Sequence, residues 1–330
     1  MPLRTRLTER FGIQHPIVSA PMGFLAGGRL AAAVSRAGGL GLIGGGYGDG
    51  DWLDREFTAA GNERVGCGFI TWSLAKKPKL LDKVLARSPA ALMLSFGSPA
   101  PFVEPIKQSG APLICQVQSI AHAREAVDAG ADVIVAQGGE AGGHSGSRST
   151  LTLVPEVADF LTEVAPDTLL IAAGGIADGR GLAAALMLGA DGVLIGSRLV
   201  ASSEAATPPG FLPAIVEADG DATVKTTVID IVRNYDWPDE FAVRALRNRF
   251  VTAWHGQESR LAETAINAVE QERYWSAFRS GDAENAGVLI GEAAGLIREV
   301  LPAARILEDM VAEAERLIAK GGRNASVLSG

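Results

Sequence analysis

The chain has 330 residues, of which 47% are hydrophobic and 21% charged, and its formal net charge is −8. That length suits one large α/β barrel or two modest domains. The negative charge argues against nucleic acid or an anionic membrane surface as a partner. We expect neither a membrane span nor a signal peptide, because no apolar run is long enough and no basic-then-apolar leader occurs.

The only two cysteines, Cys67 and Cys115, lie inside apolar runs that resemble strands. We expect both to be buried thiols that act as small hydrophobic side chains. No Cys/His spacing typical of a metal site is present, so we expect no metal. This use of cysteine also favours a cytoplasmic location.

Short apolar runs before residue 200 predict the strands of a parallel sheet. In chain order they are 16–20, 40–44, 65–70, 91–95, 113–117, 132–136, 168–172 and 192–196. Most neighbouring runs are separated by a segment with helical periodicity, and several of these segments end in glycine just before the next strand. Eight such units predict an α/β fold, a (β/α)8 TIM barrel, with a doubly wound sheet as the runner-up.

The composition changes after Ala201. Residues 202–213 are rich in Ser, Pro and Gly and predict a linker, while 240–250 and 260–276 predict helices. We therefore expect the barrel to comprise 1–205 and 301–330, interrupted by a mainly helical insertion or cap over 206–300. An amphipathic stretch over 304–320 has helical spacing. It either supplies the eighth barrel helix or forms a peripheral tail.

A glycine-rich segment, 137–146, directly follows the sixth predicted strand and contains His144. Glycine allows the backbone to approach a ligand closely, and histidine has an unperturbed pKa near neutrality. Barrel enzymes place their chemistry at this end of the strands. We predict that His144 is a catalytic base. Glu140 either orients the imidazole or caps a turn, and the other histidines are expected to be structural or solvated: His15, His122 and His255.

Two more glycine loops follow the seventh and eighth predicted strands. Exposed amides and the N-termini of the helices that follow form an anion site, and barrels often bind phosphate at these two loops. We expect Gly175, Gly196 and Ser197 to donate to phosphate oxygens and Arg198 to neutralise the charge. Asp178 is expected to cap a turn or helix. The alternative is that these glycines only form tight turns.

These segments together resemble the nitronate monooxygenase family, formerly called 2-nitropropane dioxygenases. The resemblance rests on 16–23, 140–146, 173–179 and 196–198 and covers essentially the whole chain. It implies FMN held noncovalently across the barrel mouth. The residues expected to contact FMN are Ala20, Pro21, Met22, Gly23, Gly68, Gln116, Gln137, Gly142, Gly143, Ala173, Gly174, Gly175, Gly196 and Ser197.

The resemblance also implies the reaction. His144 would remove the proton α to a nitro group, or meet the nitronate already formed, and O2 would complete the oxidation to a carbonyl compound and nitrite. The partners expected are a small-molecule substrate and O2, with no nucleic acid and no membrane. A homodimer is compatible with the sequence.

Three features depart from the family pattern: two single positions, and the segment 291–295, which lacks the flanking Trp-Ser of some members. Gly68 stands where many relatives have Asn, and Gln116 where some have Lys. These departures leave a second function open, an NAD(P)H-dependent flavin reductase acting on an enoyl thioester or a quinone. A more distant alternative is a flavin-free barrel that binds a phosphorylated ligand and uses His144 for isomerisation.

Overall fold

The computed structural model describes residues 3–324, and its main feature is a ring of eight parallel strands. Their hydrogen-bonded order is β1-β9-β8-β6-β5-β4-β3-β2, and a parallel bridge between Val18 and Leu40 joins the two ends of the sheet. The strands are β1 (Ile17–Ser19), β2 (Leu42–Gly46), β3 (Gly66–Ile70), β4 (Leu92–Ser95), β5 (Leu113–Val117), β6 (Val133–Gln137), β8 (Leu169–Ala173) and β9 (Gly192–Ile195). All eight predicted strands are present, and the barrel rather than the doubly wound sheet is confirmed.

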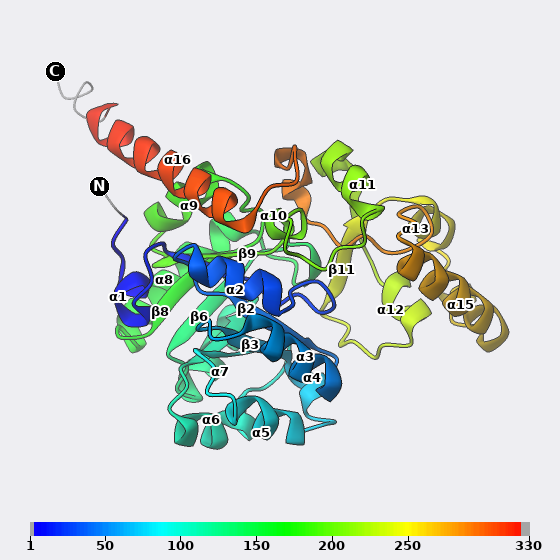
Figure 1. Cartoon of the computed structure of the whole chain (residues 1–330), viewed down its shortest axis with the longest axis horizontal. Helices are drawn as coiled ribbons and strands as arrows, with labels where there is room; N and C mark the ends of the chain where they lie inside the picture. The colour runs from blue at the N-terminus through cyan, green and yellow to red at the C-terminus, as the bar shows by residue number, and fades with distance from the viewer. Residues whose placement is uncertain (1–2, 325–330) are drawn as a thin grey trace.

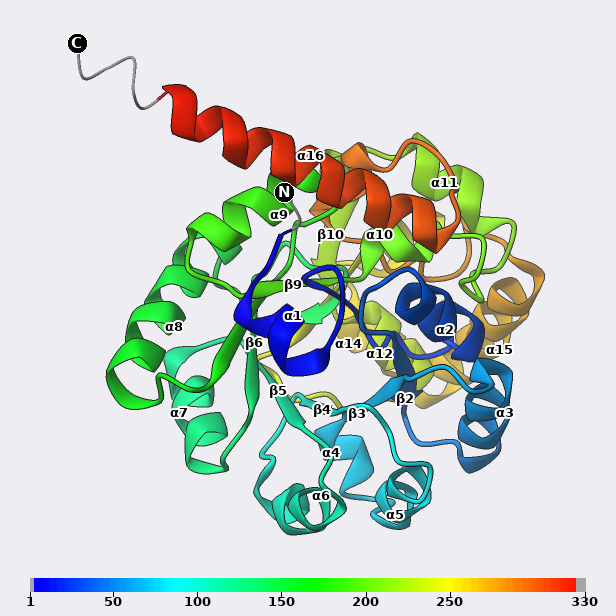
Figure 2. The same ribbon diagram turned by 60° about the vertical axis from the view of Figure 1, so that its left-hand side comes forward.

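Helices surround the strands, as Figure 2 shows. They are α2 (Gly28–Arg36), α3 (Gly50–Ala60), α4 (Thr71–Leu74), α5 (Lys79–Leu85), η1 (Ala100–Phe102), α6 (Val103–Ser109), α7 (Ile120–Asp128), α8 (Thr150–Val164), α9 (Gly179–Met187) and α10 (Ser197–Val200). Local sequence sets their limits: Ser119 caps the start of α7 through its side chain, and Gly110 ends α6 with a left-handed φ of 74°.

A short first helix, α1 (Arg6–Phe11), lies across the N-terminal end of the barrel. Its Leu7 and Phe11 side chains are buried and pack among inward-facing strand residues such as Met93 and Ile171. This helix therefore covers the barrel end opposite the strands' C-terminal ends. Those C-terminal ends are where barrels of this type place their chemistry.

The segment after α10 builds a second hydrophobic core on one side of the barrel (Figure 1). Its elements are α11 (Phe211–Glu217), η2 (Gly220–Ala222), β10 (Thr223–Thr226), α12 (Val228–Arg233), β11 (Ala242–Leu246), α13 (Arg249–Trp254), α14 (Glu258–Leu261), α15 (Thr264–Ser280) and η3 (Glu292–Leu296). The helix predicted over 260–276 is largely confirmed by α15.

The helix predicted over 240–250 is wrong, because residues 242–246 form strand β11. β11 lies in the middle of an antiparallel sheet, between β10 and β7 (Gly143–Ser145). Val243 and Ala245 are fully buried while Arg244 is only half-buried, so the side chains alternate with the period of a strand. The cap is therefore not purely helical, and its sheet includes the predicted catalytic histidine.

The last helix, α16 (Ala303–Asn324), packs along α9 and α2 and takes the place of the eighth barrel helix. Ile306, Leu307 and Met310 are buried in the main core. Just before α16, Leu301 forms a parallel bridge with Ser202, so the chain leaves and rejoins the barrel at one place. The barrel limits at 205/206 and 300/301 stay a prediction, and residues 1–2 and 325–330 lie outside the described residues.

Over residues 3–324, no helix combines the length and the apolar character that crossing a bilayer would require.

Candidate active site

A cavity lies at the C-terminal ends of the barrel strands, beneath the second core. Its empty space, counting the part open to solvent, is about 1230 Å³. His144 and every residue predicted to contact FMN line this cavity: Ala20, Pro21, Met22, Gly23, Gly68, Gln116, Gln137, Gly142, Gly143, Ala173, Gly174, Gly175, Gly196 and Ser197. The structure thus brings them together, while their roles toward a cofactor or substrate stay predictions.

His144 lies on β7 and is held by a carboxylate from α12. Its Nε2 is 3.0 Å and 2.9 Å from the two carboxylate oxygens of Asp230, and both side chains are buried. With Nε2–H donating to Asp230, the lone pair is on Nδ1, which has no protein partner among the described residues. The arrangement leaves one ring nitrogen free to accept a proton.

Burial lowers the pKa of His144 below its ordinary value of 6.5, against the opposing effect of the Asp230 carboxylate. The imidazole is therefore neutral at pH 7 and able to act as a base. One face of the ring stacks on Trp237, with centroids 3.3 Å apart, and the Phe96 ring packs edge-on to it, with centroids 6.3 Å apart. These aromatic contacts and the Asp230 bond fix the ring's orientation.

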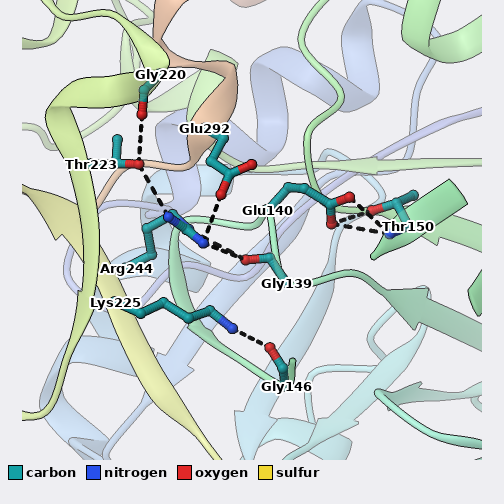
Figure 3. Close-up of polar contacts among 9 residues, drawn as sticks. All are labelled: Gly139, Glu140, Gly146, Thr150, Gly220, Thr223, Lys225, Arg244 and Glu292. Carbon is teal, nitrogen blue, oxygen red and sulfur yellow. Dashed lines mark hydrogen bonds and ion pairs between the residues drawn. The ribbon is translucent and has the colours of Figure 1, made fainter. Parts of the chain in front are cut away.

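Glu140 does not orient the imidazole. Its carboxylate accepts hydrogen bonds from the backbone amide of Thr150, at 3.0 Å, and from the Thr150 hydroxyl, at 2.9 Å (Figure 3). Thr150 is the first residue of α8, so Glu140 satisfies an amide at a helix N-terminus, where a negative charge is favourable. Of the two roles considered for Glu140, the structure shows the capping role.

Two cationic side chains of the antiparallel sheet bind backbone carbonyls of the glycine-rich segment 137–146 (Figure 3). Arg244 donates from Nε and Nη2 to the carbonyl of Gly139, at 3.3 Å and 3.2 Å, and is paired with Glu292 at 2.8 Å. Lys225 donates to the carbonyl of Gly146. The conformation of the loop that contains His144 thus depends on β10 and β11.

A glutamine network supports the same loop from the barrel side. Gln137 accepts from the side-chain amides of Gln116 and Gln118, at 3.1 Å and 3.0 Å, and donates to the carbonyl of His144 at 3.2 Å. Both acceptor positions of the Gln137 side-chain oxygen are therefore filled within the protein. Among residues 3–324, the Oε1 atom of Gln116 has no hydrogen-bond partner, so on the cavity wall it is available to accept from a ligand N–H.

The loops after β8 and β9 form a cradle of backbone amides. Gly174 and Gly175 have φ values of 101° and 73°, which favour glycine. Among residues 3–324, the amides of Gly175, Gly196 and Ser197 donate to no protein acceptor. The Ser197 hydroxyl accepts from the amide of Gly291 at 2.9 Å and keeps its own proton to donate. These donors fit a phosphate group, so the residues present suit the phosphate end of FMN.

Two details of the predicted phosphate site are corrected. The α9 N-terminus is not free, because Asp178 caps the amides of Arg180 and Gly181 and Glu313 accepts from Gly179. Arg198 does not line the cavity. Its buried side chain donates to the carbonyl of Ala201. The cradle therefore relies on loop amides and contains no cation from Arg198.

The remaining predicted positions lie away from the cavity lining. Burial raises the pKa of the Cys67 thiol, and it raises that of Cys115 to about 12, so both thiols stay protonated as expected. His122 is 3.4 Å from Glu240, and the Nδ1 atom of His255 is 3.1 Å from the Thr226 hydroxyl. Burial lowers the pKa of His15.

Sequence reasoning missed the α12 residues and the aromatic residues of the site. Asp230 holds His144, and the cavity lining also includes Arg233, Tyr47 and Trp237. One signal was available: Asp230 and Arg233 are charged residues three apart within an otherwise apolar run, 228–233. Charges in such a run are seldom buried without a partner or a ligand.

Comparison with known proteins agrees with this geometry. The nitronate monooxygenase family model matches residues 4–63 and 70–313. A nitronate monooxygenase of Neurospora crassa is 33% identical over 92% of this chain and 90% of that protein.

Two further proteins are similar. A (3aS,4S,5R,7aS)-5-hydroxy-7a-methyl-1-oxo-octahydro-1H-indene-4-carboxyl-CoA dehydrogenase of Mycobacterium tuberculosis is 36% identical over 70% of this chain, but the match spans 65% of that protein. The solved structure of FabK from Thermotoga maritima has a TM-score of 0.83 and 32% identity, and covers 96% of this chain and 98% of that one. The chain therefore belongs to the nitronate monooxygenase family and is a flavin-dependent oxidoreductase of that type.

Proposed function

We propose that this protein binds FMN in the barrel-mouth cavity and oxidises alkyl nitronates and nitroalkanes with O2 to carbonyl compounds and nitrite. The observation that carries the proposal is the His144–Asp230 pair, buried in the same cavity as the amide cradle. Family membership supports the flavin and argues against the flavin-free isomerase. The amides of Gly175, Gly196 and Ser197, together with the Ser197 hydroxyl, would hold the phosphate.

The base acts through Nδ1 of His144. A neutral nitroalkane has an acidic proton on the carbon next to nitrogen, and Nδ1 is the unpartnered ring atom that would accept it. Asp230 keeps Nε2 protonated and stabilises the imidazolium that forms, because its carboxylate bonds the opposite side of the ring. When bound, the flavin supplies the electron transfer to O2.

The test replaces the base and compares two forms of one substrate. His144→Asn, loaded with FMN, should keep the visible flavin spectrum and lose activity on neutral 1-nitropropane by roughly 10²- to 10⁴-fold. Oxygen uptake with preformed propyl nitronate should fall much less, because that anion needs no deprotonation. His255→Asn is the matched control, since His255 lies outside the cavity lining. Full activity of His144→Asn on 1-nitropropane would refute the assignment of the base.

A second candidate function is the NAD(P)H-dependent reduction of a thioester or quinone. The identity to a carboxyl-CoA dehydrogenase favours it. So does a second cavity that shares Phe96 and Gln116 with the first and offers room for a substrate tail. Rapid anaerobic bleaching of the bound flavin by NADH or NADPH, without oxygen uptake on propyl nitronate, would select this function over the first.

A further inference from the structure

Arg233 lines the cavity and is enclosed by aromatic rings on its other side. It is the last residue of α12 and is 6% exposed. Its Cζ lies 5.0 Å from the ring centroid of Tyr274, 5.3 Å from that of Trp275 and 5.8 Å from that of Phe278, all on α15. The faces of these rings attract the cation and fix the plane of the guanidinium.

The polar atoms of Arg233 are mostly unpartnered within the described chain. Nη2 donates to the Tyr274 hydroxyl, but Nε is buried without a partner and Nη1 makes no hydrogen bond to protein. Among residues 3–321, no carboxylate oxygen lies within 4.0 Å of the guanidinium. The Asp230 carboxylate acts on Arg233 only from beyond 4.0 Å and is itself bonded to His144. A buried cation without a directly paired anion is costly, so this arrangement is typical of a site that takes an anion from a ligand.

Arg233 is on the same helix as Asp230, the residue that bonds the predicted base His144. Asp230 and Arg233 are three residues apart on α12, so their side chains are neighbours on one face of the helix. Asp230 is already committed to His144. Arg233 is therefore held at the same cavity wall as the base. The amide cradle, by contrast, is built from the loops after β8 and β9 and provides its own donors for phosphate.

We propose that Arg233 is the receptor for the anionic end of the substrate and that it recognises a planar anion with two oxygens on one atom. The choice of a nitronate as that anion rests on the function proposed above. A guanidinium presents parallel N–H donors in a plane, which match two such oxygens. A nitronate and a carboxylate share this shape and charge, so an inert carboxylate can report on the site without turnover.

The experiment uses the FMN-loaded protein and butanoate, which is isosteric with propyl-1-nitronate. Butanoate binding is followed by the change in the flavin absorption spectrum and by competitive inhibition of oxygen uptake. Arg233→Gln should weaken butanoate binding, and raise the KM for propyl nitronate, by about 10- to 100-fold. The butanoate affinity and the nitronate KM of Arg233→Lys should lie between those of the unmodified protein and those of Arg233→Gln, because lysine keeps the charge and loses the planar pair of donors.

Two controls isolate the charge. Arg279→Gln removes an exposed arginine of α15 and should leave butanoate binding unchanged. Neutral butanamide should bind weakly, and equally, to all variants.

If Arg233→Gln fails to fold, arginine side-chain NMR of the unmodified holoprotein replaces it, and the Arg233 Nε–H signal should shift with butanoate and not with butanamide.

The outcomes separate this inference from the proposed function. Butanoate binding that depends on Arg233, without nitronate turnover, would support the anion receptor and contradict the nitronate assignment. Nitronate turnover with unchanged butanoate affinity in Arg233→Gln would overturn the receptor. A flavin spectrum altered by Arg233→Gln before any ligand is added, with butanoate affinity intact, would also overturn it and place Arg233 at the flavin instead.

Discussion

His144 depends on a residue 86 positions away in the sequence for its chemical state. Burial alone would leave an imidazole free to rotate and to exchange tautomers. The Asp230 carboxylate holds Nε2–H in place, and the stacked Trp237 ring restricts the plane of the imidazole. The base is thus specified by three side chains, of which the glycine-rich motif contains only one.

The pH dependence of activity should reflect the lowered pKa of His144. The base works only when neutral, and burial lowers its pKa below 6.5. We expect kcat/KM for 1-nitropropane to rise with pH through a midpoint below pH 6.5 and to approach a plateau above it. A profile still rising between pH 7 and pH 8 would contradict this state of the base.

Asp230→Asn should lower kcat/KM for 1-nitropropane by about 10- to 100-fold, because the partner that fixes the imidazole is changed. The midpoint of the pH profile should also move to lower pH, since the carboxylate raises the pKa of His144. Oxidation of preformed propyl nitronate serves as the internal control and should change less. An unshifted midpoint would mean that Asp230 has no electrostatic effect on the base.

Gly68, a departure from the family pattern, has a steric explanation. A Cβ placed there would lie 2.3 Å from Cγ of Pro21, so the Pro21 ring occupies the space a side chain would need. Gly68→Asn should lower the free energy of unfolding by about 1–3 kcal/mol and weaken FMN retention. Urea denaturation and flavin release measure the two effects. Gly321→Asn is the control, because a Cβ there would meet nothing within 4 Å.

At the scale of elements, the small antiparallel sheet decides where the base lies. β7 contains His144 and pairs with β11, whose Val243 is opposite His144 in the register. Arg244 and Lys225 then bind carbonyls on either side of the histidine. The cap therefore acts on the site through the backbone of the glycine-rich loop as well as through Asp230.

Removing the Arg244 contacts should loosen this loop. Arg244→Gln would leave the Gly139 carbonyl and the Glu292 carboxylate without their cation. We expect a loss of about 1–3 kcal/mol in the free energy of unfolding, together with a lower kcat. Arg247→Gln, an exposed neighbour, should change neither quantity measurably. Faster hydrogen exchange over 137–146 in the Arg244 variant alone would locate the effect.

At the scale of the whole molecule, the barrel is completed only after the chain has built its cap. Residues before 201 supply all eight strands, and α16 returns to cover α9 and α2. The parallel bridge between Ser202 and Leu301 marks the place of return. The ring of helices around the barrel thus depends on the last element of the chain.

Leu307→Ala tests this closure. Leu307 is fully buried in the main core, so the variant should lose about 2–5 kcal/mol in the free energy of unfolding. Leu317→Ala on the same helix is the control, because Leu317 is 37% exposed and should lose much less. Urea denaturation measures both. Equal effects of the two substitutions would show that α16 does not complete the core.

Local sequence patterns are enough to predict the barrel strands, the glycine loops and the place of His144 after the sixth strand, because each is encoded in a short stretch of chain. Apolar runs and the glycines that end helices need only neighbouring residues to be recognised. The local pattern of residues 242–246 wrongly predicts a helix, because their strand conformation depends on pairing with β10 and β7.

How those parts act together depends on the way the chain folds. Asp230, Arg233 and Trp237 reach the cavity from a segment that is distant in sequence, and no local periodicity predicts such an approach. The same is true of Glu140 and Arg198, whose side chains bind backbone atoms instead of facing the predicted site. Side-chain partners are set by packing between elements, and packing is a property of the folded chain as a whole.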